Sequence, residues 1–336
     1  MYKNIFITGG SGMLGSAVIQ DFQQNYNLYC LVHRKVLQDT SLKSVKGNIQ
    51  LPKLGLQDAE YEKICEEIDL VIHMAAITNF NKEVKDTNVE GTKNMLQLAK
   101  DANVPLYYIS TAYVYSFNEN EAYITKGNEY EQSKIEAEKI VKSSGVPYTI
   151  IRPSIILGDS KTGEVAHYQG FHYMIKLLLQ KKLPIIPGNE QAKLDCVPQD
   201  YVAKVISGLV KKQHVGGEYY VTLGENAPIL AELKIAVVDN AQKINGTDLK
   251  PPKLIGGEIF NRLFRPLLPK LPINDEMKGV LSMVKYINIT GTLPSSIEFF
   301  EKELGITEHP DIHTVIYNNM KYLIEKEFSS SPKEKV

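Results

Sequence analysis

The first half of the chain alternates short apolar runs with longer amphipathic ones. The short runs are rich in Ile, Val, Tyr and Leu and do not alternate in polarity, which is typical of strands buried on both faces. Amphipathic stretches such as VEGTKNMLQLAKDA lie between them and predict helices. This rhythm predicts a doubly wound α/β fold with a parallel sheet. The expected strands are 4–8, 27–32, 69–75, 106–110 and 148–154.

A glycine-rich loop follows the first expected strand, and an apolar helix follows the loop. Its sequence is TGGSGMLG, in which Gly10, Gly12 and Gly15 fit the pattern G-x-G-x-x-G. Glycine allows a tight turn and lets the backbone approach a pyrophosphate at the helix N-terminus. A plain strand-to-helix turn is the alternative. We predict a Rossmann-type dinucleotide site that uses Thr8, Gly9, Gly12, Met13, Leu14 and Gly15.

The end of the second expected strand distinguishes the two nicotinamide cofactors. An acidic residue there binds the ribose hydroxyls of NAD, whereas an arginine accommodates the extra phosphate of NADP. The sequence His33-Arg34-Lys35 offers no acid before Asp39. Arg34 suits a phosphate, although a solvated loop cation is the alternative. The sequence therefore favours NADPH (NADP) as the cofactor.

The strand–helix rhythm ends after Gly158 and divides the chain into two predicted regions. Residues 1–158 form the predicted NADP-binding Rossmann domain, to which 191–224 return. A smaller, mostly helical substrate-binding region is expected over 159–190 and 225–330. The polar residues 331–336 form an expected disordered tail.

Composition and charge exclude some classes of function. The 336 residues carry a net charge of -1, from 38 basic and 39 acidic side chains, so nucleic acid is not an expected partner. Cys30, Cys65 and Cys196 have neither metal-ligand nor disulfide-framework spacing, so no metal is expected. No apolar run reaches membrane-spanning length, and an apolar strand begins almost at Met1. We expect a cytoplasmic protein without a transmembrane segment, either a monomer or a homodimer.

The pattern Tyr-x-x-x-Lys occurs three times, at Tyr130/Lys134, Tyr317/Lys321 and Tyr322/Lys326. Residues four apart share a helix face, so most such pairs are surface neighbours. The first pair differs because it lies between the expected strands 106–110 and 148–154, where ligands bind in such sheets. A nearby lysine charge favours tyrosinate, so we expect it to lower the phenol pKa. The first pair is therefore the predicted acid–base device.

Six motifs in order resemble the extended short-chain dehydrogenases/reductases. They are TGGSGMLG, DLVIHMAAITNF, NVEGT, STAYVY, YEQSK and IRPSIILG, spread over about the first 160 residues. The resemblance implies that Tyr130 is the acid–base residue and Lys134 its partner, while Thr111 holds the substrate oxygen. It also implies cofactor contacts or support from Asn48, Ile49, Ala75, Ala76, Asn88, Ser110, Tyr130, Lys134, Pro153 and Ser154.

Within this superfamily the chain most resembles thioester reductases and fatty acyl-CoA reductases. The run GNIQLPKLGLQDAEYEKI, together with STAYVY and RPS, carries this likeness. Asn48 stands where an aspartate is usual, but its amide oxygen can still accept from an adenine amine. The resemblance implies NADPH-dependent reduction of an acyl thioester, bound to CoA or to an acyl carrier protein, to an aldehyde and in some members on to an alcohol.

Three alternatives stay open at this point. Two belong to the same superfamily: an NADP-dependent ketone or aldehyde reductase, and an NAD-dependent sugar-nucleotide epimerase or dehydratase. The third is a non-catalytic, NADP-sensing binding protein, but such proteins typically lose the Tyr/Lys pair that this chain retains.

Overall fold

The computed structural model describes residues 2–33, 42–78, 83–115, 128–260, 262, 266 and 274–328. The chain divides into two compact units, each assembled from three segments. Unit 1 comprises Met1–Ser154, Gln199–Thr222 and Pro294–His309. Unit 2 comprises Ile155–Pro198, Leu223–Leu293 and Pro310–Val336. The predicted tail at 331–336 lies outside the described residues.

Unit 1 is built on a seven-stranded sheet in which every neighbouring pair is parallel. The strands are β1 (Asn4–Thr8), β2 (Asn27–Val32), β3 (Lys43–Lys46), β4 (Leu70–His73), β5 (Leu106–Ile109), β6 (Tyr148–Pro153) and β10 (Glu218–Val221). Their order is β10-β6-β5-β4-β1-β2-β3. The chain reverses its direction of travel across the sheet between β1 and β4, and ligands of open α/β sheets bind at such a switch point. The predicted Rossmann-type α/β fold is confirmed.

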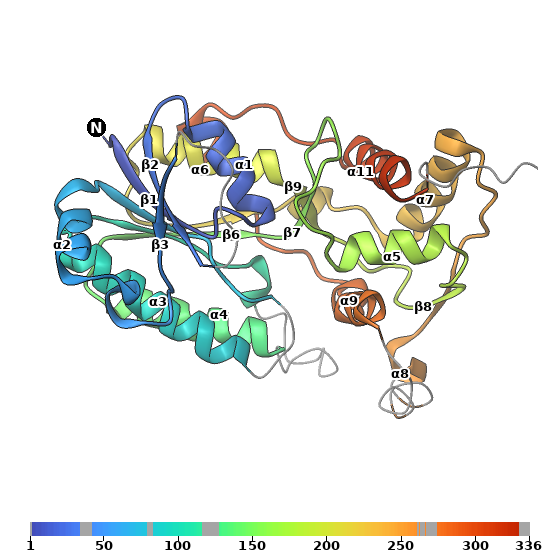
Figure 1. Cartoon of the computed structure of the whole chain (residues 1–336). Helices are drawn as coiled ribbons and strands as arrows, with labels where there is room; N and C mark the ends of the chain where they lie inside the picture. Colours follow the sequence, from blue (N-terminus) through green and yellow to red (C-terminus); the bar gives the residue numbers. More distant parts are fainter. Residues whose placement is uncertain are drawn as a thin grey trace, which may run out of the picture. The chain divides into compact units, whose positions relative to one another are not determined.

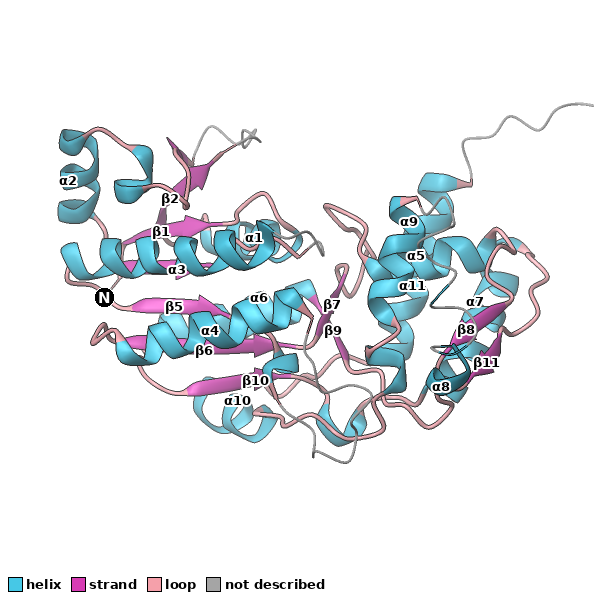
Figure 2. Ribbon diagram, turned by 90° about the horizontal axis from the view of Figure 1, so that it is seen from below, coloured by secondary structure: helices cyan, strands magenta, loops and turns pink. Residues whose placement is uncertain are grey.

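Helices cover both faces of this sheet (Figure 1, Figure 2). On one face α1 packs against α6, and on the other α3 packs against α4. Two further helices, α2 and α10, pack on α3 and α6 respectively. The bounds are α1 (Met13–Phe22), α2 (Asp58–Glu67), α3 (Glu83–Asp101), α4 (Glu129–Ser143), α6 (Gln199–Lys211) and α10 (Ile297–Leu304).

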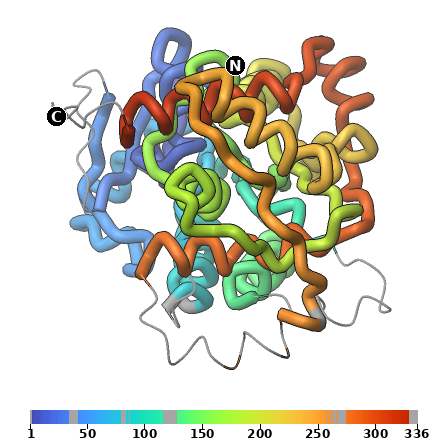
Figure 3. Tube along the Cα trace, turned by 90° about the vertical axis from the view of Figure 1, so that its right-hand side faces the viewer, coloured from blue at the N-terminus to red at the C-terminus, as the bar shows by residue number. Residues whose placement is uncertain are grey.

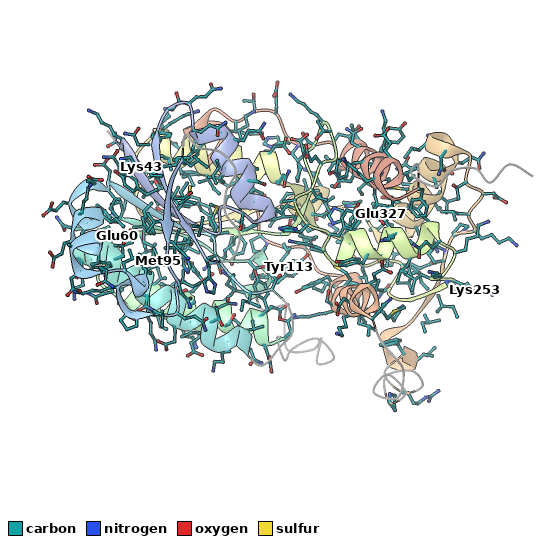
Figure 4. The ribbon with its side chains drawn as sticks, in the orientation of Figure 1. Lys43, Glu60, Met95, Tyr113, Lys253 and Glu327 are labelled. Atoms are coloured by element: carbon teal, nitrogen blue, oxygen red, sulfur yellow. The ribbon has the colours of Figure 1, made fainter. Side chains whose placement is uncertain are left out.

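One hydrophobic cluster lies between the sheet and the helices α3 and α4. Phe6 of β1 contributes to it, and Met95 of α3, labelled in Figure 4, is fully buried in it. Neighbouring strand positions Ile5 and Ile7 are also fully buried, although they do not belong to this cluster. Both faces of the central strands are therefore covered, which explains why the apolar runs lack alternation.

Unit 2 is mostly helical, with two short strand pairs. Its main helices are α5 (Gly170–Leu179), α7 (Leu230–Asn245), α9 (Asp275–Met283) and α11 (Ile312–Glu327), and α8 (Gly257–Ile259) is a single turn. The pairs are β7 (Ile155–Leu157) with β9 (Cys196–Pro198), and β8 (Ile185–Pro187) with β11 (Lys253–Ile255). Figure 3 traces green α5 and orange α9, which pack together. The assignment of substrate binding to this part of the chain stays a prediction.

One segment of unit 1 has no counterpart in the predicted division of the chain. Residues Pro294–His309 join the sheet unit through contacts at its β10 edge. Ser296 Oγ accepts from the Tyr220 backbone N–H at 3.0 Å, and Thr222 Oγ1 donates to Pro294 O at 2.6 Å. Over the described residues, no helix is both long enough and apolar enough to cross a membrane.

Candidate active site

The glycine loop is held in its shape by two glycines that tolerate no side chain. Gly9 has φ +79°, and a Cβ there would lie 2.6 Å from the backbone nitrogen of Ala75. At Gly15 a Cβ would lie 2.0 Å from the backbone oxygen of Gly9. Gly12 is less crowded, because its Cβ would meet only that same oxygen, at 3.2 Å. The loop thus packs closely on the β4 end through Gly9 and on helix α1 through Gly15.

The N-terminus of α1 is suited to an anion. Its N-cap is Gly12, no side chain caps the first turn, and that turn contains no acidic residue. The first backbone N–H groups of a helix have no partner within the helix and carry partial positive charge. Because Met13 and Leu14 have buried side chains, they can serve a pyrophosphate only through their backbone.

Most of the predicted site residues follow the carboxyl ends of sheet strands. Ala75 and Ala76 follow β4, Ser110 and Thr111 follow β5, and Ser154 follows β6. The carboxyl ends of parallel strands lie at one edge of a sheet. The fold therefore brings these residues to the edge that also carries the glycine loop. Further along it, Pro153 ends β6, and Asn48 and Ile49 follow β3.

Two buried hydroxyl groups lie at this edge of the sheet. Ser110 and Ser154 are 3% and 5% exposed, and neither Oγ atom has a hydrogen-bond partner among the described residues. Leaving a buried polar group unsatisfied costs about 1–3 kcal/mol. Thr111 Oγ1 accepts from the Tyr113 backbone N–H at 3.4 Å and retains its own proton for donation. Buried hydroxyls without a described partner, at the same sheet edge as the glycine loop, fit the polar groups of a dinucleotide.

Tyr130 and Lys134 lie one turn apart in the first half of α4. Asn128 caps this helix by accepting from the Glu131 backbone N–H, so the helix begins just before the tyrosine. Lys134 is 3% exposed and donates to Ile109 O at 2.7 Å, which ties it to the end of β5. Its Nζ lies 6.0 Å from the centre of the Tyr130 ring. The pair is therefore positioned at the end of a central strand.

The titration of this pair differs from the sequence-based expectation. Burial, and then the nearby Glu131 carboxylate, raise the pKa of the Tyr130 phenol above its ordinary value, whereas the lysine was expected to lower it. Burial also lowers the pKa of Lys134 to about 7, against the opposing effect of Glu138. The lysine charge does not dominate, because Lys134 Nζ is bonded to Ile109 O and burial lowers the pKa of Lys134 itself. The phenol is thus protonated at neutral pH, as a proton donor must be.

Asn88 of α3 holds the loop after β4 against α4. Its side chain accepts from Ile77 N at 2.8 Å, donates to Ile77 O at 3.1 Å and donates to Ser133 Oγ at 2.9 Å. Ser133 Oγ in turn donates to Tyr130 O at 2.6 Å. These contacts of Asn88 fix the loop after β4 and, through Ser133, the helix turn that carries Tyr130. Direct contact with the cofactor stays a prediction for this residue.

We expect the substitution Asn88→Ala to lower the free energy of unfolding by about 1–3 kcal/mol, because it leaves buried polar groups without partners. Urea unfolding at constant pH measures the loss. Asn245→Ala is the matched control, since Asn245 is exposed and its side chain accepts from Thr247 within a turn. Equal, small losses in both variants would contradict the bracing role.

The adenine end of the predicted site is only partly described. Asn48 Oδ1 accepts from Gln50 N at 3.0 Å and so retains one lone pair for an adenine amine. Ile49 packs on Gly91, where a Cβ would lie 2.7 Å from its Cδ1 atom. Arg34, the predicted phosphate ligand, lies outside the described residues, as does Lys35.

His73, at the end of β4, is a structural histidine in the neutral form. It is 1% exposed, and its Nδ1 atom shares a 2.7 Å hydrogen bond with Thr8 Oγ1. Burial and then the charge of Lys134 lower its pKa from an ordinary 6.5 to about 3. Across the described residues no cluster of His, Cys, Asp and Glu could hold a metal ion.

The depressed pKa of His73 predicts a loss of stability in acid. The unfolded chain takes up this proton as pH falls below 6.5, whereas the folded chain does so only near 3. The free energy of unfolding should therefore decline by up to about 1.4 kcal/mol per pH unit from this group. Urea unfolding at pH 6.5 and 5 should show a shallower slope for His73→Gln than for the wild type. The exposed His313→Gln should retain the full slope, and parallel slopes in all three proteins would refute the assignment.

The other two Tyr-x-x-x-Lys pairs lie in α11 of unit 2. Lys326 Nζ sits 5.5 Å from the centre of the Tyr322 ring, so they are ordinary helix neighbours. Ser133 and Glu138 were not among the residues predicted for the site. Helical spacing could have identified both residues, because Ser133 stands three residues after Tyr130 and Glu138 stands four residues after Lys134.

Comparison with known families decides the classification. A family model described as "Male sterility protein" matches residues 35–206, slightly more than half of the chain. The chain belongs to this NAD-binding male sterility family. Its resemblance to extended short-chain dehydrogenases/reductases of the thioester and fatty acyl-CoA reductase type is thereby confirmed. Membership makes the chain an NAD(P)-binding member of an oxidoreductase family.

Relatives of this male sterility family member include parts of large synthases. The chain is 27% identical over 281 residues to a linear gramicidin synthase protein of Brevibacillus parabrevis, covering 71% of this chain but 5% of the synthase. It is 24% identical to a putative fatty acyl-CoA reductase of Drosophila melanogaster, covering 78% of this chain and 63% of the reductase. The chain thus spans less than two thirds of these relatives. The terminal R domain of the myxalamid PKS-NRPS pathway matches with TM-score 0.77 at 22% identity, covering 99% of this chain and 93% of that domain.

Proposed function

We propose that the chain is an NADPH-dependent reductase that converts an acyl thioester to an aldehyde. The observation that carries the proposal is a half-buried Tyr130 one turn from a buried Lys134, whose Nζ bonds to the end of β5 at the sheet edge that also carries the glycine loop. The family membership and the thioester reductase and acyl-CoA reductase relatives support the substrate class. The buried, unsatisfied hydroxyls of Ser110 and Ser154 add polar contacts that suit the nicotinamide end.

The residues of this chain divide the chemistry among them. Bound NADPH supplies a hydride for the thioester carbonyl carbon. Thr111 Oγ1 retains a proton with which to hold the carbonyl oxygen, and the Tyr130 phenol donates the proton that the reduced oxygen requires. The C–S bond of the resulting hemithioacetal then breaks: the carbonyl of the aldehyde forms, and the hydroxyl proton is passed to the leaving sulfur. Lys134 binds the ribose and carries positive charge next to the reacting oxygen. The net reaction consumes one thioester, one NADPH and one proton, and releases one aldehyde, one thiol and NADP⁺.

A panel of substrates tests the proposed function. The purified protein is mixed with NADPH and acyl-CoAs of several chain lengths, with a pantetheine thioester, with free aldehydes and with ketones. We expect loss of the reduced-nicotinamide absorbance with thioesters, together with release of free thiol. Reaction with ketones alone, or tightly bound NAD released on denaturation, would instead indicate the ketone reductase or the epimerase. If the protein binds NADPH but turns over none of these substrates, the result would favour the non-catalytic, NADP-sensing binding protein.

The preference for NADPH predicts a selective effect of Arg34. We expect Arg34→Ala to raise the Kd for NADPH about tenfold or more, because charge-assisted phosphate contacts contribute about 1.5–3 kcal/mol. The Kd for NADH should change little. Titration of each nucleotide by its fluorescence measures both constants, with the exposed Lys100→Ala as the charge-matched control. Equal changes for the two nucleotides would contradict the assignment of Arg34 to the extra phosphate.

A further inference from the structure

A row of buried charges continues along α4 from the predicted catalytic pair. Glu138 stands four residues after Lys134 on the same helix face and is 5% exposed. Its carboxylate accepts two hydrogen bonds from Arg152 of β6, at 2.8 Å from Nε and 2.5 Å from Nη2. Arg152 is itself 4% exposed, and the same Nη2 atom contacts Glu218 of β10 at 2.5 Å. The carboxylate of Glu138 is therefore fixed in place by a bidentate partner.

The charge row does not end at the arginine. Lys142, one turn further along α4, pairs with Glu218 at 2.7 Å and approaches Glu138 at 3.7 Å. Arg152 also lies 4.8 Å from the centre of the Tyr220 ring. The outer end of the row is half exposed at Glu218 and Lys142, whereas the inner end is buried. Side chains of alternating charge therefore extend from the surface toward the buried Lys134.

Such a network requires an explanation beyond stability. Burying ion pairs costs desolvation energy that often cancels their attraction, so apolar residues would serve the core at least as well. A lysine that has lost almost all contact with water is likewise costly in its charged form. Ile109 O accepts one of its protons, but this neutral oxygen satisfies only one of the three donors.

We propose that Glu138, held by Arg152, is a positioning residue that favours the ammonium form of Lys134 at the end of β5. Glu138 acts on Lys134 through its negative charge. The hydrogen bond that Lys134 Nζ donates goes to Ile109 O at the end of β5. Arg152 orients the carboxylate and prevents it from turning toward solvent. This inference deepens the proposed function and rests on it, since the ammonium group is what Lys134 brings to the ribose and to the reacting oxygen.

The other described groups that contact Lys134 are uncharged, and the face of one of them, the Tyr108 ring, favours an ammonium group. From β4, His73 is neutral, and from β5 the Tyr108 ring lies 4.7 Å under the ammonium group. From its own helix, Tyr130 is protonated, and burial lowers the pKa of Lys134 to about 7. From α3, the side chain of Asn88 is a neutral amide that contacts Ser133. Among these, Glu138 is the group whose charge favours the ammonium form.

A titration of Lys134 tests the inference without any substrate. The ¹³Cε signal of Lys134 is identified by its loss in Lys134→Arg, and its midpoint is followed by NMR in the full chain. In Glu138→Gln we expect the midpoint to move to lower pH, and in Glu138→Asp, which retains the charge, most of the shift should be reversed. Glu136→Gln is the matched control, because Glu136 is on the same helix and pairs with Lys85 at the surface. Its midpoint should equal that of the wild type.

Activity supplies the second readout. If the wild type reduces thioesters, the alkaline limb of its kcat/KM profile should move to lower pH in Glu138→Gln. A shift of one pH unit lowers the rate about tenfold above the limb and leaves it nearly unchanged below. Inactivity of the wild type toward every thioester would overturn the proposed function, but the NMR midpoint would still decide the role of Glu138.

A third variant covers the case in which Glu138→Gln does not fold. In Glu138→Gln/Arg152→Gln both buried charges are removed together, which is better tolerated than removing one partner. The midpoint of Lys134 should still fall, because Glu138 stands one helical turn from Lys134, whereas Arg152 belongs to β6 and bonds to Glu138 and Glu218. An unchanged midpoint in a folded variant of either kind would overturn the inference and leave the row a purely structural network.

Discussion

Replacing Tyr130 with Phe should lower the rate of thioester reduction by about a hundred- to ten-thousand-fold, the typical contribution of a positioned acid. Phe retains the ring and removes only the hydroxyl group, so the half-buried site loses its proton donor and little of its packing. Binding of NADPH should stay within about twofold of the wild type. Single-turnover oxidation of bound NADPH, measured with saturating acyl-CoA, reports the chemical step directly.

The chain provides a control with the same spacing. Tyr322→Phe removes a hydroxyl from the Tyr322/Lys326 pair of α11, whose lysine sits 5.5 Å from the ring centre. This variant should reduce thioesters at the wild-type rate. Retention of more than about a tenth of the rate by Tyr130→Phe would remove the phenol from the mechanism.

The second large effect is expected at Gly15. A methyl group at this position would lie 2.0 Å from the Gly9 oxygen and 2.7 Å from the Gly10 Cα atom, and both are backbone atoms. The clash can be relieved only if the backbone of the loop and the first turn of α1 move apart. We expect Gly15→Ala to lower the free energy of unfolding by about 3 kcal/mol or more and to abolish NADPH binding. Urea unfolding and nucleotide titration measure the two effects.

Two other glycines separate these effects. Gly256→Ala meets no atom of the described residues within 4 Å and should change stability by less than about 1 kcal/mol. Gly12→Ala meets the Gly9 oxygen at 3.2 Å, so it should keep the fold but weaken NADPH binding at the helix N-terminus. Wild-type stability and affinity in Gly15→Ala would contradict the packing described for the loop.

The central strands were predictable because their sequences are apolar without interruption. The edge strand β3 was not, since its sequence is KSVK and only Val45 is buried. Lysines on an exposed edge discourage pairing with other chains, and they also hide the strand from a hydrophobic pattern. The two pairs in unit 2 are three residues per strand, too short to carry a pattern. The return of Pro294–His309 to unit 1 depends on contacts with β10 that no local signal encodes.

The site was predictable where position along the fold decides it. Tyr130 was separated from its two rivals because it lies between two sheet strands. The direction in which the pKa of Tyr130 shifts was not predictable from spacing. It depends on the burial of the phenol and on the hydrogen bond that Lys134 donates to Ile109 O. The same holds for Asn88, whose amide is committed to Ile77 and Ser133.

Transfer of deuterium from labelled NADPH to the product tests the central claim most directly. The full chain is incubated with an acyl-CoA and NADPH carrying deuterium at one or the other C4 position, and the aldehyde is analysed by mass spectrometry. The account predicts an aldehyde with one deuterium on its carbonyl carbon from one of the two labelled cofactors, together with one free thiol per aldehyde. Unlabelled aldehyde from both cofactors, or no aldehyde from any thioester while NADPH is bound, would contradict it.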